Sequence, residues 1–360
     1  MHVSTHTGRS SSRKAPLFDL DVVLAVGVYR TRVSLSAHAE KTAGHARVIR
    51  AGHDDEAPPS QSTVGGDTMR RRVGIVGFGQ LGQFLAAEVQ RRPESLELAF
   101  VWSRGRVVQG LPPHLVLEDL ALAATRHPDL VVEVAHPSLV RTHGEQLLRH
   151  CDLLVGSPTA FAEPDVEARL RAAASRHALF VPCGALWGLH DIRALADRGQ
   201  LAELTVTMTK HPSALRLADA EMRVRCDRAA LGTQAVTLYD GPVRGLCPMA
   251  PNNVNSMAAA AMAAHTLGFD GVRGRLVADP GLADFHSLEL DVVGPSETDG
   301  RAFRVRTLRM NPSDRGAVTA SATYGAFLGS MLAKTTMVKL AIQKRERHPR
   351  GPPLITLRHL

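Results

Sequence analysis

The segment Arg72–Val89 constrains what this chain can fold into more than any other part of the sequence. A β-branched run, Arg72–Val76, leads into the glycine-rich string Gly77-Phe78-Gly79-Gln80-Leu81-Gly82, and apolar residues of helical spacing follow as far as Val89. A lone G-x-G-x-x-G string is weak evidence, but between a buried strand and a helix it is typical of a phosphate-binding turn. A glycine turn without a ligand is the alternative interpretation.

The glycines of this turn have separate tasks. Gly77 permits the tight turn, Gly79 lets the backbone approach a pyrophosphate, and Gly82 allows the helix to pack closely against the strand. Gln80 and Leu81 lie in the first turn of the helix, whose unpaired N–H groups and positive dipole end attract phosphates. We therefore predict that Gly77, Gly79, Gln80, Leu81 and Gly82 bind a nicotinamide dinucleotide in a Rossmann-type domain.

Hydrophobic periodicity predicts the fold class of the remaining chain. Strand-like and helical segments alternate about five times between residues 72 and 183, which indicates βαβ units and an α/β fold with a doubly wound parallel sheet. Residues 202–209, 288–293 and 303–309 instead alternate apolar with polar side chains, as half-exposed antiparallel strands do. Together with an alanine-rich helical segment, 257–266, they predict a second, smaller α+β domain for substrate binding or dimerisation.

These changes of pattern divide the chain into five parts. Residues 1–68 are predicted to be a mostly disordered or targeting-like extension, 69–189 the Rossmann domain, and 190–317 the α+β domain. Residues 318–344 carry helical periodicity and are expected to return to the Rossmann domain, and 345–360 form a loose tail. Because the first residues hold Arg and Ser without a carboxylate, mitochondrial targeting stays open beside the cytoplasmic location that we expect.

Charge and cysteine usage argue against several function classes. A net charge of +8 and a pI near 9.8 would suit nucleic acid, but the arginines are spread out, without a run of five basic residues or interleaved aromatics. The four cysteines form no C-x-x-C pair, which indicates reduced thiols and no structural metal. No apolar run reaches the roughly 18 residues that span a bilayer. We therefore expect no nucleic-acid, membrane or metal partner.

The residues after the second predicted strand bear on which dinucleotide binds. An NAD site normally places Asp or Glu there, to bind the ribose 2′-hydroxyl. Leu98–Trp102 is followed instead by Ser103-Arg104-Gly105-Arg106, which offers no carboxylate. Two guanidinium groups can hold a 2′-phosphate bidentately, whereas solvated loop charges are the alternative. We expect Ser103 and Arg104 to contact the cofactor, and NADP to bind at least as well as NAD.

Further motifs occur in an order that resembles the L-aspartate dehydrogenase family over about residues 70–330. Outside the glycine turn no single motif is decisive, and their order and spacing together carry the resemblance. The motifs are Val132-Glu133-Val134-Ala135, Ser157–Ala162, Gly184-Ala185-Leu186-Trp187-Gly188-Leu189, Pro251-Asn252-Asn253-Val254-Asn255, and Ala278-Asp279-Pro280 followed by Phe285-His286. Within this family the sequence resembles the animal proteins described as aspartate dehydrogenase domain-containing.

This resemblance implies a Rossmann domain and a small α/β domain that shapes the substrate pocket, commonly in a homodimer. It implies NAD(P)-dependent oxidative deamination of L-aspartate to iminoaspartate or oxaloacetate, which in some organisms feeds NAD biosynthesis. His286 matches the family's active-site histidine. Ala160 and Asn255 match cofactor-contacting positions, Ala160 through its backbone and Asn255 through its side-chain amide, and Ala135 is expected to contact the cofactor too.

The chemistry that the resemblance implies needs an acid–base group, and it needs hydrogen-bond donors that bind the two carboxylates of aspartate. Hydride leaves Cα as the amine becomes an iminium, so the amine must first be neutral and a water must later attack the imine. A histidine that titrates near neutrality can serve either step, and a structural histidine is the alternative for His286. For the two carboxylates we name Lys210 with His211, Asn253, and His136. A surface lysine and a helix-capping histidine are the alternatives for Lys210 and His136.

The sequence departs from the family pattern at several points, among them His190, which stands where the family has an acidic residue. Asp284 stands where the family has the asparagine before its histidine, and Trp187 replaces a small residue, so that a bulky indole could narrow the site. Two other functions therefore stay open: a dehydrogenase for another small amino or hydroxy acid, and a catalytically inactive NAD(P)-binding sensor or partner protein.

Overall fold

The computed structural model describes residues 22–26, 29–33, 70–105, 108–333 and 338–339. The chain falls into two compact units, residues 1–65 and 66–360. In the first unit β1 (Val22–Val26) and β2 (Tyr29–Val33) form an antiparallel pair. The remainder of the predicted extension, the predicted tail and Arg106 lie outside the described residues. The five-part division of the chain stays a prediction.

The second unit contains a six-stranded sheet in the order β13-β7-β6-β5-β3-β4. Its strands are β3 (Arg71–Val76), β4 (Leu96–Trp102), β5 (Leu130–Glu133), β6 (Asp152–Val155), β7 (Leu179–Val181) and β13 (Val338–Lys339). Neighbouring strands are parallel except for β13, which pairs antiparallel with β7. Beyond β4, a single parallel bridge between Val101 and Val116 stands where a doubly wound sheet has its third strand. The predicted Rossmann-type α/β fold is confirmed.

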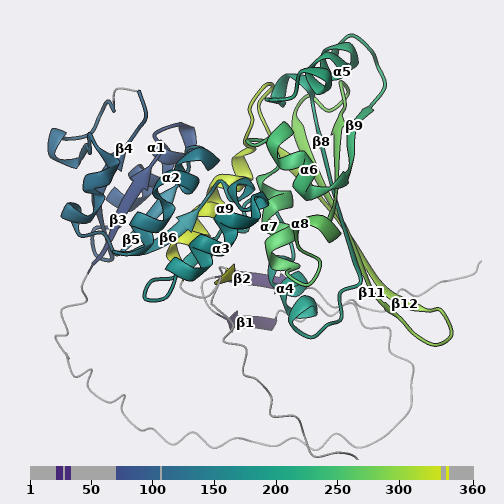
Figure 1. The fold of residues 1–360 in the computed structure, drawn as a ribbon, viewed down its shortest axis with the longest axis horizontal. Helices are drawn as coiled ribbons and strands as arrows, with labels where there is room; N and C mark the ends of the chain where they lie inside the picture. Colours follow the sequence, from purple (N-terminus) through teal and green to yellow (C-terminus); the bar gives the residue numbers. More distant parts are fainter. Residues whose placement is uncertain (1–21, 27–28, 34–69, 106–107, 334–337, 340–360) are drawn as a thin grey trace, which may run out of the picture. The chain divides into compact units, whose positions relative to one another are not determined.

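Helices cover both faces of this sheet (Figure 1). On one face, α1 (Gln80–Gln90) and α9 (Ser321–Leu332) share a hydrophobic core with β3 and β4. On the other face, α2 (Pro137–Leu148) and α3 (Pro164–Ala173) bury their apolar sides. Because both faces are covered, the central strands are continuously apolar rather than alternating, as their sequences indicated.

The predicted C-terminal helix is shorter than its periodicity suggested. Helix α9 ends at Leu332, and the backbone of Ala333 is extended, with φ −82° and ψ 119°. The chain then reaches the sheet again as β13, beside β7. At Val338 and Lys339, strand pairing at the sheet edge therefore stands where the sequence pattern predicted helix.

The second sheet has the order β12-β11-β8-β10-β9. Its strands are β8 (Glu203–Lys210), β9 (Val236–Pro242), β10 (Arg273–Ala278), β11 (Phe285–Ser296) and β12 (Ala302–Pro312). The three strands that the sequence predicted here, β8, β11 and β12, pair antiparallel as expected. Strand β10, which the sequence pattern did not predict, is parallel to β8. The long crossover between them makes this possible, because it contains β9 and the helices α5 (Ala220–Ala230), α6 (Val243–Met249), α7 (Asn255–Ala263) and α8 (Gly268–Gly271).

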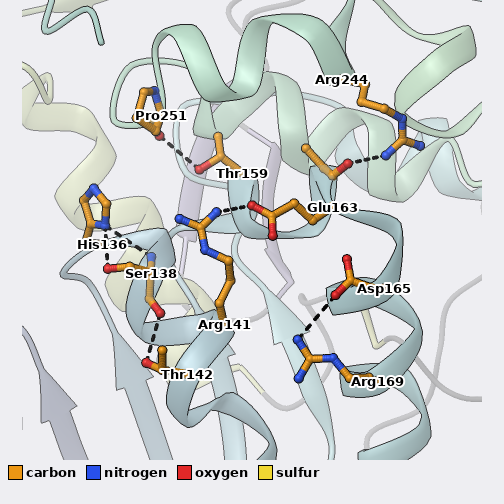
Figure 2. Close-up of polar contacts among 11 residues, drawn as sticks. His136, Ser138, Arg141, Thr142, Thr159, Glu163, Asp165, Arg169, Arg244 and Pro251 are labelled. Atoms are coloured by element: carbon orange, nitrogen blue, oxygen red, sulfur yellow. Dashed lines mark hydrogen bonds and ion pairs between the residues drawn. The ribbon is translucent and has the colours of Figure 1, made fainter.

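Helix α7 and the 3-10 helix η3 (Pro158–Ala162), which follows β6, join the two halves of this unit. Figure 2 shows two of the polar contacts at this junction. Thr159 Oγ1 donates to the carbonyl oxygen of Pro251 at 3.0 Å, and the Arg244 guanidinium donates to the carbonyl oxygen of Ala162. These contacts fix the end of β6 against the crossover of the second sheet.

Candidate functional site

The glycine turn has the geometry that its three glycines predict. Gly77 has φ +111°, which L side chains rarely adopt. A Cβ on Gly82 would lie 1.9 Å from the Gly77 carbonyl oxygen, so only glycine allows this close packing of helix and turn. A Cβ on Gly79 would meet nothing within 4 Å. The backbone at Gly79 is therefore open on the side where a pyrophosphate would approach.

The N-terminus of α1 is equally suited to a phosphate. Its N-cap, Gly79, provides no side-chain hydrogen bond to the first turn, so the N–H groups of that turn can bind a ligand. Tyr324 on α9 stacks near Phe84 with ring centroids 5.4 Å apart, and its hydroxyl donates to Gln80 Oε1 at 3.2 Å. The turn therefore fits the phosphates of a dinucleotide, and α9 provides a wall beside it.

This turn opens into a cleft of about 1380 Å³ that both sheets of the unit line. The cleft brings together eight of the residues that the sequence singled out: Gly79, Gln80, Leu81, Ala135, Lys210, Asn253, Asn255 and His286. The nucleotide-binding turn and the family's histidine position therefore face one shared space. The segment from Ser313 to Ser321, between β12 and α9, also lines this space.

The other predicted residues lie outside the lining of the cleft. Gly77 and Gly82 shape the turn behind it, and Ala160 is fully buried in η3. Ser103 and Arg104 follow β4 at the outer end of the sheet. His136 caps α2, where its Nδ1 accepts from the Ser138 backbone at 3.2 Å.

His136 lines a neighbouring cavity of about 430 Å³. His211 caps the 3-10 turn Pro212–Ala214, where its Nδ1 accepts from the Ser213 backbone at 3.2 Å. Trp187 is 66% exposed and does not line the cleft, so the indole leaves the cleft unobstructed.

Three buried polar side chains form a row across adjacent strands at one end of the second sheet. In the register of β11 and β12, His286 pairs with Asn311, and Ser287 pairs with Thr209 of β8. The next step of that antiparallel register places Lys210 beside His286. Because directly opposed residues project from the same face, Lys210, His286 and Asn311 form one row, and all three line the cleft.

His286 is neutral at physiological pH in this environment. Burial, together with the positive charge of Lys210, lowers the pKa of His286 to about 4, against a backbone hydrogen bond at Ala317. Its Nε2 lies 3.1 Å from Ser313 Oγ. The imidazole is therefore held by the segment that follows β12 and is available to accept a proton.

Lys210 is buried without a carboxylate partner in the described part of the chain. Its Nζ donates to the carbonyl oxygen of Val318 at 2.8 Å. Burial lowers the pKa of Lys210 to about 7. An amine in this state can take up a proton or bind an anion as the site requires.

The two asparagines of the cleft differ in how their amides are used. Asn253 Oδ1 accepts from the Arg216 backbone at 2.7 Å, and its Nδ2 donates to the Ala214 carbonyl at 3.0 Å. Asn253 therefore holds the chain that carries Arg216, another residue of the cleft wall. Asn311 Oδ1, in contrast, is buried and has no hydrogen-bond partner among the described residues. Sequence reasoning missed Asn311 and Arg216, because neither lies in one of the motifs.

The loops at the ends of β5 and β6 are fixed by Glu133. This buried carboxylate accepts from the backbone of Ala135, His136 and Ser157 and from Ser157 Oγ, at 2.8–3.0 Å. Burial raises the pKa of Glu133 to about 7, and these hydrogen bonds act in the opposite direction. Two loops that border the dinucleotide turn are thereby joined through one side chain.

Two arginines near the six-stranded sheet also act on His136. Burial lowers the pKa of His136, and the charges of Arg104 and Arg141 lower it further. The carboxyl ends of β4 and β5 are therefore electropositive. Among the described residues no group of three His, Cys, Asp or Glu side chains could hold a metal ion. No helix in the described ranges is long and apolar enough to cross a membrane.

A glycine turn suited to a dinucleotide and a buried Lys–His–Asn row line one cleft, and together they indicate a nicotinamide-dependent dehydrogenase. Residues 77–181 match the family described as homoserine dehydrogenase, NAD binding domain, and residues 191–330 match the family described as aspartate dehydrogenase, C-terminal. The cofactor is therefore NAD or NADP.

Individual proteins agree with these matches. The aspartate dehydrogenase domain-containing protein of Xenopus tropicalis is 49% identical over 271 residues, which cover 73% of this chain and 94% of that protein. L-aspartate dehydrogenase 1 of Bordetella pertussis is 30% identical over 266 residues, covering 72% and 96%. The crystal structure of aspartate dehydrogenase from Thermotoga maritima shares the fold, with a TM-score of 0.52 at 19% identity, over 73% and 94% of the two chains. This chain belongs to the aspartate dehydrogenase family.

Proposed function

We propose that this dehydrogenase oxidises L-aspartate to iminoaspartate, which water converts to oxaloacetate and ammonium. The observation that carries this proposal is the buried row of Lys210, His286 and Asn311, which lines the same cleft as the dinucleotide turn. The names of the similar bacterial proteins support aspartate as the substrate. When bound, the nicotinamide ring supplies the acceptor for the hydride that leaves Cα.

Within this reaction His286 is our candidate catalytic acid–base group. It is buried, neutral, and held at Nε2 by Ser313, so that it can accept a proton from water as the imine is hydrolysed. Removal of such a group typically slows an enzyme by about 10²–10⁴-fold.

The cleft also offers cations for the two carboxylates of aspartate. Arg216 and Arg315 line it beside Lys210. The Arg216 side chain donates to the Ser213 and Gly316 carbonyl oxygens, at 2.6 and 3.2 Å, which holds it at the cleft wall. The sequence suggested a carboxylate-binding role for Asn253, and we assign this role to Arg216 instead. The side-chain amide of Asn253 holds the backbone of Arg216 in place.

For the cofactor we propose that NADP binds at least as well as NAD. The support is electrostatic: Arg104 follows β4 where an NAD site has a carboxylate, and its charge acts on His136 at the end of β5. Ser103 and Arg104 would contact the 2′-phosphate, while Ala135 and Asn255, on the cleft wall, would contact the nicotinamide end. Ala160 is buried in η3, and we propose that its backbone contributes near the nicotinamide end of the cofactor.

A substrate panel tests the proposed activity. Purified protein is mixed with NADP or NAD and each of a set of amino and hydroxy acids, and absorbance of the reduced nicotinamide is followed. We expect aspartate-dependent reduction, with oxaloacetate and ammonium as products. Turnover of a different acid would replace aspartate as the substrate, and cofactor binding without any turnover would favour a sensor. The homodimer and the cytoplasmic location stay predictions, the first open to sedimentation analysis and the second to cell imaging.

A further inference from the structure

Lys210 stands out because of the residue type that the sequence places there. It is the only lysine between residues 70 and 333, a stretch in which arginine carries all the other fixed positive charge. Arginine remains protonated in proteins, whereas a buried lysine can lose its proton near neutral pH. A position that needed only a permanent cation would suit arginine, which this chain uses everywhere else in the stretch.

The position of Lys210 suits proton transfer. It ends β8 beside His286 of β11, on the face of the sheet that borders the cleft. Strands β8, β11 and β12 lie side by side in Figure 1. One N–H of Lys210 is directed at the Val318 carbonyl oxygen, 2.8 Å away. In a neutral amine this contact fixes the nitrogen and leaves its lone pair free.

The charged groups around Lys210 do not neutralise it. His286 is the ionisable neighbour from β11, and the Asp279 backbone amide donates to the Lys210 carbonyl oxygen at 2.9 Å. Asp284, Asp314, Arg216 and Arg315 line the same cleft. No ion pair joins any of these carboxylates to Lys210 among the described residues, and burial lowers the pKa of Lys210 to about 7.

We propose that neutral Lys210 removes a proton from the α-ammonium group of the bound amino acid before hydride leaves Cα. This inference rests on the proposed amino-acid dehydrogenase function. It gives the Lys–His pair two separate tasks. Lys210 prepares the amine, and His286 serves the later attack of water.

The step balances with groups already named. The Nζ lone pair forms a new N–H bond while one N–H bond of the substrate ammonium breaks, and that bond's electron pair stays on the substrate nitrogen. The pair then forms the C=N bond as hydride leaves Cα, with the nicotinamide of the proposed function as oxidant. Overall, aspartate, oxidised cofactor and water give oxaloacetate, ammonium, reduced cofactor and one proton.

Two substitutions separate a proton acceptor from a permanent cation. Lys210→Arg keeps the charge but cannot accept a proton, and Lys210→Met removes both. If Lys210 is the base, we expect both variants to lose about 10²–10⁴-fold in kcat while still binding the cofactor. Added primary amines should restore activity to Lys210→Met in proportion to their basicity. A Lys210→Arg enzyme with a near-wild-type rate, or rescue independent of amine basicity, would overturn the inference.

A spectroscopic titration tests the same point without turnover. The full chain is labelled with 15Nζ-lysine, and the signal that Lys210→Met lacks is followed from pH 5 to 11. We expect it to titrate well below the ordinary lysine value of about 10.4. Titration at that ordinary value overturns the Lys210 assignment alone. Absence of amino-acid turnover by the wild-type protein, in contrast, overturns the proposed function and with it this role.

Discussion

His286 stands directly opposite Asn311 in the antiparallel register of β11 and β12, and both side chains are buried in the wall of the cleft. The imidazole has a partner in Ser313, whereas Asn311 Oδ1 has none among the described residues. A buried acceptor without a donor is costly, by about 1–3 kcal/mol. A substrate that carries an N–H group would remove this cost.

We therefore predict that Asn311→Leu weakens the binding of aspartate by about 5- to 100-fold, the loss of one buried hydrogen bond. Binding of succinate, which lacks the amine, should change little. Calorimetry with both ligands in the presence of NADP measures this difference. Thr307→Val, two alternations away on the same strand, is the matched control. Equal weakening of aspartate and succinate would contradict an amine contact.

His286→Asn should lower kcat by about 10²–10⁴-fold and leave the cofactor Kd unchanged, because the imidazole is proposed to act on the substrate and on water. Steady-state rates and NADP titrations measure the two quantities. Ser313→Ala is a useful companion, since it removes the hydroxyl near Nε2 but keeps the ring. A His286→Asn enzyme of normal rate would leave the histidine with a structural role.

The lowered pKa of His286 also predicts acid sensitivity of the fold. In the unfolded chain this histidine takes a proton near pH 6.5, whereas in the folded protein it does so only near pH 4. Between these values the unfolded state binds the extra proton, so the free energy of unfolding falls as the pH falls, by about 3 kcal/mol in total. Denaturant unfolding at pH 7 and pH 4.5 measures this loss. It should be smaller in His286→Asn.

Two glycine substitutions in the dinucleotide turn should impair different properties of the protein, one its thermal stability and the other its cofactor binding. Gly82→Ala places a Cβ against the Gly77 carbonyl oxygen and should lower the melting temperature of the free protein. Gly79→Ala meets no atom of the protein and should leave that temperature nearly unchanged. It should nevertheless abolish the stabilisation by added NADP, because the methyl group occupies the path of the pyrophosphate. Thermal melts with and without NADP distinguish the two.

Arg104→Ala should weaken NADP binding by about tenfold or more while NAD binding changes little, because only NADP carries the 2′-phosphate. Dissociation constants for both cofactors at one fixed salt concentration measure this. The control is Arg198→Ala, which removes an exposed arginine at the end of helix α4 (Leu189–Asp197). A wild-type protein that strongly prefers NAD would contradict the assignment of Arg104.

The sequence predicted the nucleotide half better than the substrate half, for physical reasons. The turn at Gly77–Gly82 is a local structure, so its glycines and flanking periodicity are sufficient to predict it. The row of Lys210, His286 and Asn311 depends on the register of three strands that are far apart in the chain. The sequence predicted Lys210 only as a residue that binds a substrate carboxylate, and it did not predict Asn311. No local pattern shows which residues face each other across strands.

The second sheet illustrates the same limit. Strand β10 is short and contains Gly274, where a Cβ would crowd Met257 at 3.1 Å. Its role as the parallel partner of β8 arises from the crossover and not from its own periodicity. Helix α5, with its many charges, likewise lacks the apolar stripe that would have predicted it.

The small side chains of helix α7 determine the spacing between this helix and η3. Every residue from Met257 to Ala263 is buried, and most of these side chains are methyl groups. The helix packs against η3 of the nucleotide half and against α4. Methyl-sized spacers thus determine how far the end of β6 lies from the helix that Asn255 begins. Enlarging Ala259 or Ala260 by two carbons would widen that separation. Because hydride transfer takes place over only a few ångströms, its rate should fall before the stability of the fold does.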